Sequence, residues 1–229
     1  MTHVKRAYDG SRRREQARAR RLAVVQAARE LFEVGGFRQT TIAAIAKRAG
    51  VSSESIYKTF GTKAALAKAV FDLELAGDDE PVPIPQRTWY VQTLAQSDPV
   101  VLLRMQSGNN RRILERVAAL ELVIRATGAD PALATLAAEA RRQRRFGAAT
   151  ITGRLHELGA LRPGLTHEAA GDIYYAIASP EVFMLLTHDQ GWSGTAYEEW
   201  LADQLIYALV GRGDGAIAAA ATPSSRDRS

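Results

Sequence analysis

Side chains that can hydrogen-bond to nucleic acid are concentrated in one short segment of this 229-residue chain, between Thr40 and Leu66. Hydroxyl, amine and carboxylate groups are the kinds that proteins use to contact backbone phosphates and the edges of DNA bases. Binding, rather than catalysis, is the chemistry that such a set supports. The residues expected to face outward together are Ser53, Glu54, Ser55, Tyr57, Lys58 and Thr59.

Two short helices are expected to position these side chains. Apolar residues follow the i, i+3, i+4, i+7 spacing of one buried helical face, at Ile42, Ile45, Ala46 and Ala49. Gly50 then stands where this helix must stop, because glycine adopts the left-handed backbone of a helix end without steric cost. Either Thr40 or Thr41 can cap the start of the helix.

A second helix is expected directly after the turn. Ser52 or Ser53 can cap it, while Ile56 and Phe60 lie four residues apart on the face that packs inward. Gly61 ends the helix, and Thr62 can cap a third one that begins at Lys63. Helix, tight turn and helix form the motif that places its second helix in the major groove of DNA.

The motif T-T-I-x-x-I-A-x-x-A-G-V-S-x-x-x-I-Y-x-x-F-x-x-K-x-x-L, read from Thr40 to Leu66, resembles the tetracycline-repressor (TetR) family of transcriptional regulators. With the preceding helix, the specific resemblance covers Arg18 to Phe71. It implies an all-α protein with an N-terminal three-helix helix-turn-helix domain and a larger C-terminal helical domain for ligand binding and dimerisation. It also implies operator DNA, a second copy of the chain and a small-molecule effector as partners.

The resemblance further implies roles for single residues. Thr40 and Thr41 would contact phosphates, the Tyr57 hydroxyl would contact another, and Lys63 would hold one more. Residues Ser52 to Ser55, together with Lys58, would face bases or the DNA backbone. Members of the family often carry histidine or another ring at the positions of Lys58 and Thr59, so the base preferences of relatives do not transfer to this chain.

Charge is distributed unevenly along the chain. Residues 1–68 contain 15 Lys or Arg and 5 Asp or Glu, whereas the rest contain 15 and 20. A basic end followed by an acidic remainder is typical of a nucleic-acid-binding domain joined to a domain with another role. The chain has no cysteine and no apolar run of membrane-spanning length, so we expect a cytoplasmic protein that does not enter a membrane.

The sequence also predicts where the segments of the chain divide. The basic N-terminus, with Lys5 and Arg6, can track phosphates, enter a minor groove or remain a solvated tail. Residues 77–86 contain three prolines and three acids, which predicts a linker and makes a poor calcium site. The expected divisions are an arm at 1–13, a helix-turn-helix domain at 14–62, a linking helix at 63–76, a ligand-binding and dimerisation domain at 77–212 and a tail at 213–229.

Only helices are expected after residue 87. Asp98-Pro99 and Asp130-Pro131 each provide a cap followed by proline at the first helical position. The predicted helices cover about 98–126, with an interruption near 107–110, then 131–158, 167–188 with a kink at Pro180, and 196–211 with Thr195 as cap.

The last two helices are apolar on more than one side, which predicts a two-fold dimer that pairs them in a four-helix bundle. The residues assigned to the dimer interface are Ile177, Tyr197, Trp200, Leu201, Leu205 and Ala208. Aromatic residues with a few polar groups suit a ligand pocket, although each is also suited to an ordinary core. The pocket candidates are Trp89, Tyr90, Met105, Asn109, Phe146, Tyr174, Tyr175, Phe183 and Met184. Arg141, Arg142, Arg144 and Arg145 can meet an anionic ligand, meet DNA or form a solvated face.

Catalytic motifs are missing from the sequence. The four histidines, at positions 3, 156, 167 and 188, have no partner at metal-ligand spacing, and no phosphate loop or nucleophile elbow occurs. We therefore expect no enzyme, no cofactor and no metal. The sequence predicts a ligand-responsive regulator, most simply a repressor released by a small molecule. An activator of the same fold and a sequence-tolerant, nucleoid-type DNA-binding protein are the alternatives.

Overall fold

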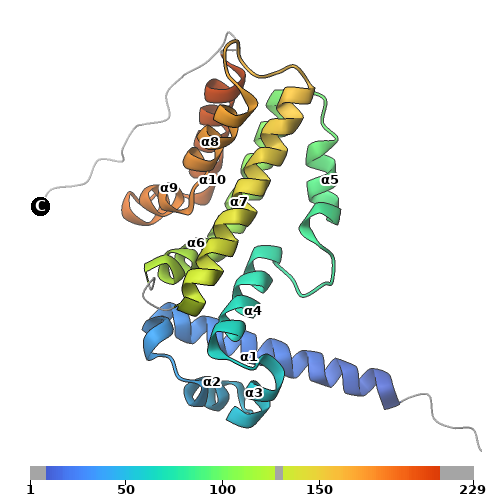
Figure 1. Ribbon diagram of the computed structural model, residues 1–229, viewed down its shortest axis with the longest axis vertical. Helices are drawn as coiled ribbons and strands as arrows, with labels where there is room; N and C mark the ends of the chain where they lie inside the picture. Colours follow the sequence, from blue (N-terminus) through green and yellow to red (C-terminus); the bar gives the residue numbers. More distant parts are fainter. Residues whose placement is uncertain (1–8, 127–130, 212–229) are drawn as a thin grey trace, which may run out of the picture.

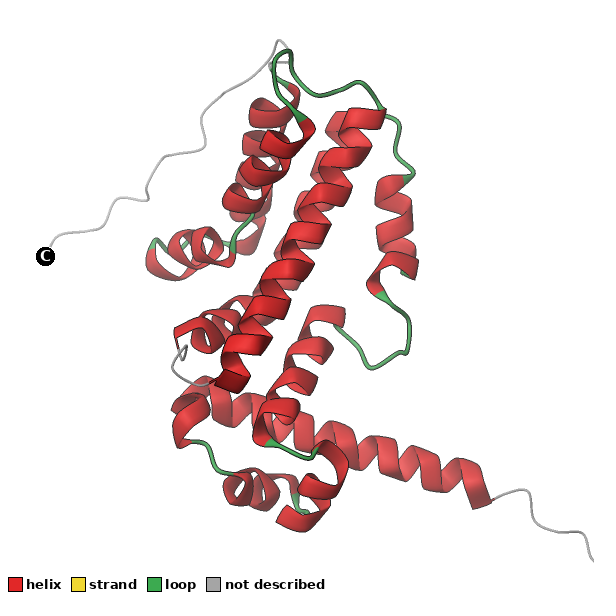
Figure 2. Cartoon of the chain, in the orientation of Figure 1, coloured by secondary structure: helices red, strands yellow, loops and turns green. Residues whose placement is uncertain are grey.

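The computed structural model describes residues 9–126 and 131–211, and all regular elements in these ranges are helical (Figure 2). Asp130, expected as a helix cap, and the tail at 213–229 lie outside the described residues, as does most of the N-terminal arm. The N-terminal part contains α1 (Asp9–Gln39), α2 (Ile42–Ala49), α3 (Ser53–Phe60) and α4 (Lys63–Ala76). In Figure 1, α2 and α3 lie at one end of the molecule, with α1 passing behind α4.

The capping residues and the glycine predicted for the helix-turn-helix begin and end its helices in the structure. Thr41, Ser52 and Thr62 each accept a hydrogen bond at a helix start, from the backbone amides of Ala44, Ser55 and Ala65. Gly50 ends α2 with φ 68° and ψ 32°, a left-handed conformation that an L side chain rarely adopts. Ile45 and Ile56 are buried at the centre of the domain, so α2 and α3 are held at a fixed angle.

Helix α1 is longer than the sequence predicts. It begins at Asp9 instead of Arg14, so residues 9–13 are helical. Gly36 interrupts the helix with non-helical φ and ψ of 68° and 169°, and helical hydrogen bonding then resumes as far as Gln39.

The C-terminal part is built around α6 (Pro99–Ala126), which packs against α4, α7, α9 and α10. The other elements are the 3-10 turn η1 (Ile84–Gln86), α5 (Thr88–Leu94), α7 (Pro131–Glu157), α8 (His167–Ile177), α9 (Pro180–Met184), η2 (Leu185–Asp189), α10 (Gly194–Leu205) and η3 (Ile206–Val210). The predicted interruption of α6 near 107–110 is wrong. Gly108 lies inside the helix, on the side that faces α10, where a Cβ would come within 2.9 Å of the Glu198 carboxylate.

Pro180 begins a helix instead of kinking one. Its missing amide hydrogen would break a continuing helix, whereas at the first position of α9 none is needed, and Ser179 caps that start through the amide of Val182. The predicted single helix over 167–188 is therefore two helices and a π-helical turn. Ser193, not Thr195, caps α10.

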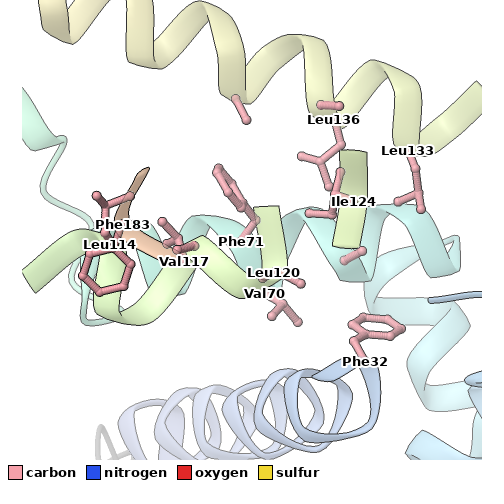
Figure 3. Packing of buried hydrophobic residues seen from close by; sticks show 14 of the residues in the cluster. Phe32, Val70, Phe71, Leu114, Val117, Leu120, Ile124, Leu133, Leu136 and Phe183 are labelled. Carbon is pink, nitrogen blue, oxygen red and sulfur yellow. The ribbon is translucent and has the colours of Figure 1, made fainter. Parts of the chain in front are cut away.

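The two parts of the chain share one apolar core. Figure 3 shows Phe32 of α1 facing α4 and α6, with Leu120 and Ile124 of α6 between it and the α7 residues Leu133 and Leu136. Because the core is continuous across α1, α4, α6 and α7, the helix-turn-helix end cannot move independently of these helices without exposing apolar surface.

Half of the stripe assigned to the dimer interface lies inside the monomer. Tyr197, Leu201 and Leu205 are each 0% exposed, since α10 turns this face toward α6 of the same chain. Their assignment to an interface is corrected to the monomer core. Ile177, Trp200 and Ala208 are partly buried, which leaves them some accessible surface.

Candidate functional site

Helix α3 presents a short polar face to solvent. Ile56 is 1% exposed and anchors the helix, whereas Tyr57 is 54% exposed even though it is aromatic. The exposed residues of this face are Ser52, Glu54, Ser55, Tyr57, Lys58 and Thr59, with Ser53 half-buried. A half-exposed tyrosine among polar residues has its hydroxyl available for a partner outside the chain.

The hydroxyl groups of α3 differ in what they can offer to DNA. Ser52 Oγ accepts from the Ser55 amide and donates its proton to Ser55 Oγ at 3.0 Å. Thr59 Oγ1 donates to the Ser55 carbonyl at 2.8 Å. Ser55 therefore keeps its own hydroxyl proton for an acceptor outside the protein.

Thr40 does not fit the phosphate contact that the resemblance implied. Its side chain is buried, and its hydroxyl lies 2.8 Å from the Gly36 carbonyl and 3.0 Å from the Leu31 carbonyl. The hydroxyl proton is thus used to close the end of α1, so the role assigned to Thr40 is corrected to a structural one. Thr41 is exposed and accepts the cap bond from Ala44, which leaves its proton for an external acceptor.

Lys63 bridges the start of α4 and the corner between α1 and α2. Its Nζ donates to the carbonyls of Phe37 and Thr40 at 2.9 and 3.0 Å, and lies 4.2 Å from the centre of the Phe37 ring. An ammonium group has three donors, so one remains for a phosphate after these two bonds. The residue has a structural role that its sequence position did not reveal.

Two further basic residues belong to the same end of the molecule. Arg38 and Lys47 are exposed, on the last turns of α1 and α2. Arg48, beside Lys47, forms an ion pair with Glu30. The sequence signal for Arg38 and Lys47 was available in the charge imbalance of residues 1–68 but not in the motif.

A cavity of about 560 Å³ lies in the C-terminal part, between α4, α5, α6, α7 and α8. Phe71 and Leu75 of α4 and Ile84 and Pro85 of the linker form part of its wall. Its volume is in the range of sites that bind drug-sized molecules, and its wall is mostly apolar with a few polar groups, as such sites are.

Amide groups of α6 supply the polar part of the wall. Gln106 Nε2 donates to the Tyr174 hydroxyl at 3.0 Å, while Gln106 Oε1 is buried with no hydrogen-bond partner among the described residues. Asn110 Nδ2 is likewise buried beside the Tyr197 hydroxyl without a well-formed bond. Burial raises the pKa of Tyr174 to about 12, so its phenol stays neutral at physiological pH.

The charges at the cavity wall are largely paired. Arg144 donates to the buried Glu121 carboxylate at 3.1 Å and to the Tyr175 carbonyl at 3.2 Å. Arg142 lines the cavity from an exposed position. Because most charges of the wall are already paired, a buried ion would find few counter-charges here. An apolar molecule with one uncharged polar group needs none, so it fits this cavity better.

Five of the nine predicted pocket residues line this cavity, namely Trp89, Tyr90, Phe146, Tyr174 and Tyr175. Met105, Asn109, Phe183 and Met184 do not line it, so their assignment to this cavity is corrected. Asn109 is held by Thr93 and Arg112, and Phe183 packs edge-on against Tyr197 with ring centres 4.9 Å apart.

Helical spacing could have shown that the side-chain amides of Gln106 and Asn110, and not that of Asn109, face the cavity. Gln106, Asn110, Ile113, Val117 and Glu121 all line the cavity and lie on one face of α6. Asn109 lies on a neighbouring face, one residue out of this register.

The acidic linker residues are used as ion-pair partners. Asp78 is held by both Nη atoms of Arg87 at 2.6 and 2.9 Å, and Asp79 by Arg18 of α1. In the part of the chain that the structure describes, no group of three potential metal ligands occurs. No helix in the described ranges has both the length and the apolar character needed to cross a bilayer.

The fold is a helix-turn-helix domain joined by one shared helix to a helical domain with a ligand-sized cavity. Residues 24–70 match the family model described as bacterial regulatory proteins, tetR family. The match covers the helix-turn-helix segment that the sequence motif also singles out, so this segment is similar to the N-terminal region of that family. A comparison with curated proteins gives no match.

Solved structures of tetR-type regulators share the fold over most of the chain. FadR from Bacillus subtilis in complex with stearoyl-CoA has a TM-score of 0.66 at 18% identity, covering 82% of this chain and 98% of FadR. SmeT with triclosan gives 0.62 at 17% identity, covering 91% and 100%; SmeT is the repressor of the Stenotrophomonas maltophilia efflux pump SmeDEF. A putative TetR-family regulator from Rhodococcus sp. gives 0.63 at 15%, covering 83% and 98%.

Proposed function

We propose that the protein is a homodimeric transcriptional repressor that binds operator DNA through α3 and is released when a small apolar molecule enters the cavity. Supporting the DNA-binding half are the exposed polar face of α3, the basic residues around it and the family match over residues 24–70. Supporting the ligand-binding half are the cavity and the stearoyl-CoA and triclosan complexes of two proteins with the same fold.

The position of α4 is the observation that supports a coupling between ligand binding and DNA binding. Its first residue, Lys63, is bonded to the corner between α1 and α2, and its last two turns contribute Phe71 and Leu75 to the cavity wall. A ligand that displaces these two side chains therefore acts on the helix that fixes the helix-turn-helix. For release, the ligand must bind the DNA-incompetent arrangement more tightly than the DNA-competent one.

The contacts proposed for DNA follow from which side chains of the helix-turn-helix are exposed to solvent. Ser55 donates to a base-edge acceptor or a phosphate, Tyr57 donates to a phosphate, and Lys58 provides charge along the groove. Thr41 and the remaining donor of Lys63 contact phosphates at the edge of the motif, and Ser52, Ser53 and Glu54 lie at the start of α3 toward the bases. In a dimer, the two α3 helices would occupy major grooves roughly 34–36 Å apart.

Dimerisation is proposed through the outer faces of α8 and α10. Tyr207 of η3, which follows α10, is 55% exposed, and Ile177, Trp200 and Ala208 retain accessible surface. The resemblance to the family favours the same pairing. The residues already buried inside the monomer take no part in it.

The effector is proposed to be apolar, with a group that can donate a hydrogen bond to Gln106 Oε1. Buried acceptors without partners are costly, so a ligand that supplies the missing donor gains specificity. Triclosan and stearate serve as probes in a thermal unfolding assay. A probe that raises the melting temperature should also weaken DNA binding, and DNA should weaken probe binding by the same factor.

The DNA-binding surface is tested by selecting bound duplexes from a randomised pool. We expect enrichment of two related half-sites about one helical turn apart. The Tyr57→Phe variant should bind all selected sites more weakly by a similar factor, because a phosphate contact carries no sequence information. Ser55→Ala should change the ranking of sites if the hydroxyl contacts a base. Absence of any enriched sequence would contradict the proposed function.

A further inference from the structure

The first turns of α1 project from the molecule without a packing surface of their own. Helix α1 starts at Asp9, every residue from 10 to 21 is exposed, and the first buried side chain is Val24. Figure 1 shows this end, in dark blue, extending beyond α2 and α3 on the side opposite α8 and α10. We call residues 9–21 the α1 extension; at 1.5 Å per residue it is about 18 Å long.

Composition indicates what kind of partner the α1 extension fits. It contains six arginines, two acids, and no apolar residue other than Ala17 and Ala19. Such a segment has no apolar stripe to place in a protein groove. Its positive charge complements a polyanion. The family match begins only at residue 24, so the extension lies outside the region that the family model covers.

The helical register continues the face that meets α3. The guanidinium carbon of Arg21 lies 4.9 Å from the ring centre of Phe60, at the end of α3. Arg14 is seven residues earlier and therefore on nearly the same face, two turns further out. Arg13 and Arg20 are related in the same way on the neighbouring strip of the helix.

The base of the α1 extension is fixed in direction. Arg18 binds both carboxylate oxygens of Asp79 in the linker through Nε and Nη2. This pair joins the extension to the C-terminal part, so the basic helix is held at a set angle relative to α3. A positioned helix loses less conformational entropy on binding than a disordered arm would.

We propose that the α1 extension binds backbone phosphates of duplex DNA immediately outside the half-site contacted by α3, with Arg14 and Arg20 as phosphate-binding residues. This inference rests on the proposed function. If the chain dimerises through α8 and α10, both extensions lie at the outer ends of the bound DNA. Their length of about 18 Å corresponds to about five base pairs of flank on each side, at 3.4 Å per base pair.

The test measures affinity as a function of flank length. The full chain is titrated onto the selected operator carrying 0, 3, 6, 9 or 12 extra base pairs on each side, at several salt concentrations. For the wild type, affinity should increase with flank length and level off once the flank exceeds about five base pairs. Scrambling the flank sequence should leave the gain unchanged, because phosphates are the same in every sequence.

Two double variants test whether the α1 extension causes the gain of affinity with flank length. Arg14→Gln with Arg20→Gln should bind the longest duplex on the order of tenfold more weakly at 0.1 M salt. Its salt slope should fall by about two per protomer, while its affinity for the flank-free duplex stays that of the wild type. The matched control is Arg141→Gln with Arg145→Gln, which removes two exposed arginines of α7 and should leave all duplexes unaffected.

The outcomes separate this inference from the proposed function. Wild-type affinity independent of flank length, or a double variant equal to wild type on the longest duplex, would overturn the role of the extension while specific binding stands. An equal loss on short and long duplexes would also overturn it, because the arginines would then act inside the half-site. If the wild type binds no selected operator at all, the proposed function itself fails.

Discussion

Lys63 connects two segments that are distant in sequence, and its substitution separates a structural role from a phosphate contact. Removing a charged donor from two carbonyls should lower the free energy of unfolding by about 1.5–3 kcal/mol. Lys63→Met keeps the length of the side chain and loses both bonds. We expect lower stability in urea titrations together with weaker binding to every DNA sequence.

Lys58 provides the control for this prediction, since it is an exposed lysine on α3. Lys58→Met should weaken DNA binding while leaving the urea midpoint within error of the wild type. If Lys63→Met also leaves the midpoint unchanged, the bridge between α4 and the α1–α2 corner contributes nothing and Lys63 acts only on DNA.

Single residues show where sequence reasoning about the site succeeds and where it stops. The caps Thr41, Ser52 and Thr62 could be predicted because capping depends on residues three positions apart. Thr40 could not, because its hydroxyl reaches the carbonyls of Leu31 and Gly36 only through the break in helical geometry at Gly36. Whether a threonine faces DNA or closes a helix end depends on that tertiary contact.

At the scale of elements, α7 offers a direct way to fill the cavity. Gly147 lines the cavity, and a Cβ at this position would meet no atom within 4 Å. Gly147→Phe should place a ring in the space that an effector would occupy and weaken operator binding without any ligand, as measured by anisotropy. Gly147→Ala adds only a methyl group, so it should raise stability by about 0.5–1 kcal/mol and leave operator affinity unchanged.

The result for Gly147→Phe can contradict the coupling through α4. A variant that is folded, binds the operator with wild-type affinity and still responds to an effector would show that the cavity is not the effector site.

The linker gives a prediction about pH. Hydrogen bonds from Arg87 hold the pKa of Asp78 down to about 2, below the value of about 3.9 for an unperturbed aspartate. A depressed carboxyl pKa contributes stability above the unfolded-state pKa, and this contribution is lost as pH falls from about 4 toward 2. Asp78→Asn should therefore lower the melting temperature at pH 7, by an amount that shrinks toward zero near pH 2.

Glu199→Gln is a suitable comparison for the linker variant, because Glu199 is an exposed acid on α10. Its melting temperature should follow the wild type at each pH. A constant difference between Asp78→Asn and wild type across pH 7 to 2 would rule out the ion pair as the cause.

Helix positions were largely predictable, and the exceptions have tertiary causes. Gly108 and the asparagines beside it suggested a break in α6, yet the helix continues through them and packs against α10, where Glu198 approaches Gly108. Pro180 suggested a kink, but Ser179 directly before it provides the cap for a new helix. Sequence periodicity detects apolar faces without showing which helix covers them, so it cannot tell that Tyr197, Leu201 and Leu205 pack against α6 and not against a second copy of the chain.

For the molecule as a whole, the charge asymmetry, the continuous core and the placement of α4 together link the two ends of the chain. In the proposed function, the basic end binds DNA, the apolar cavity binds an effector, and α4 belongs to both regions. The part that follows from sequence is the fold class and the exposed polar face of α3. The cavity wall is assembled from residues between Phe71 and Ala178, and this arrangement becomes visible only in the folded chain.

Sequence-specific binding by a dimer is the central claim, and fluorescence anisotropy tests it most directly. The purified protein is titrated onto a labelled fragment from upstream of its own gene and onto a shuffled fragment, at two salt concentrations. We predict tight, salt-sensitive binding to the first alone, saturating at two chains per site, which is twice the 24.9 kDa of one chain. Equal affinity for both fragments would favour a sequence-tolerant DNA binder, and binding to neither at either salt concentration would contradict the account.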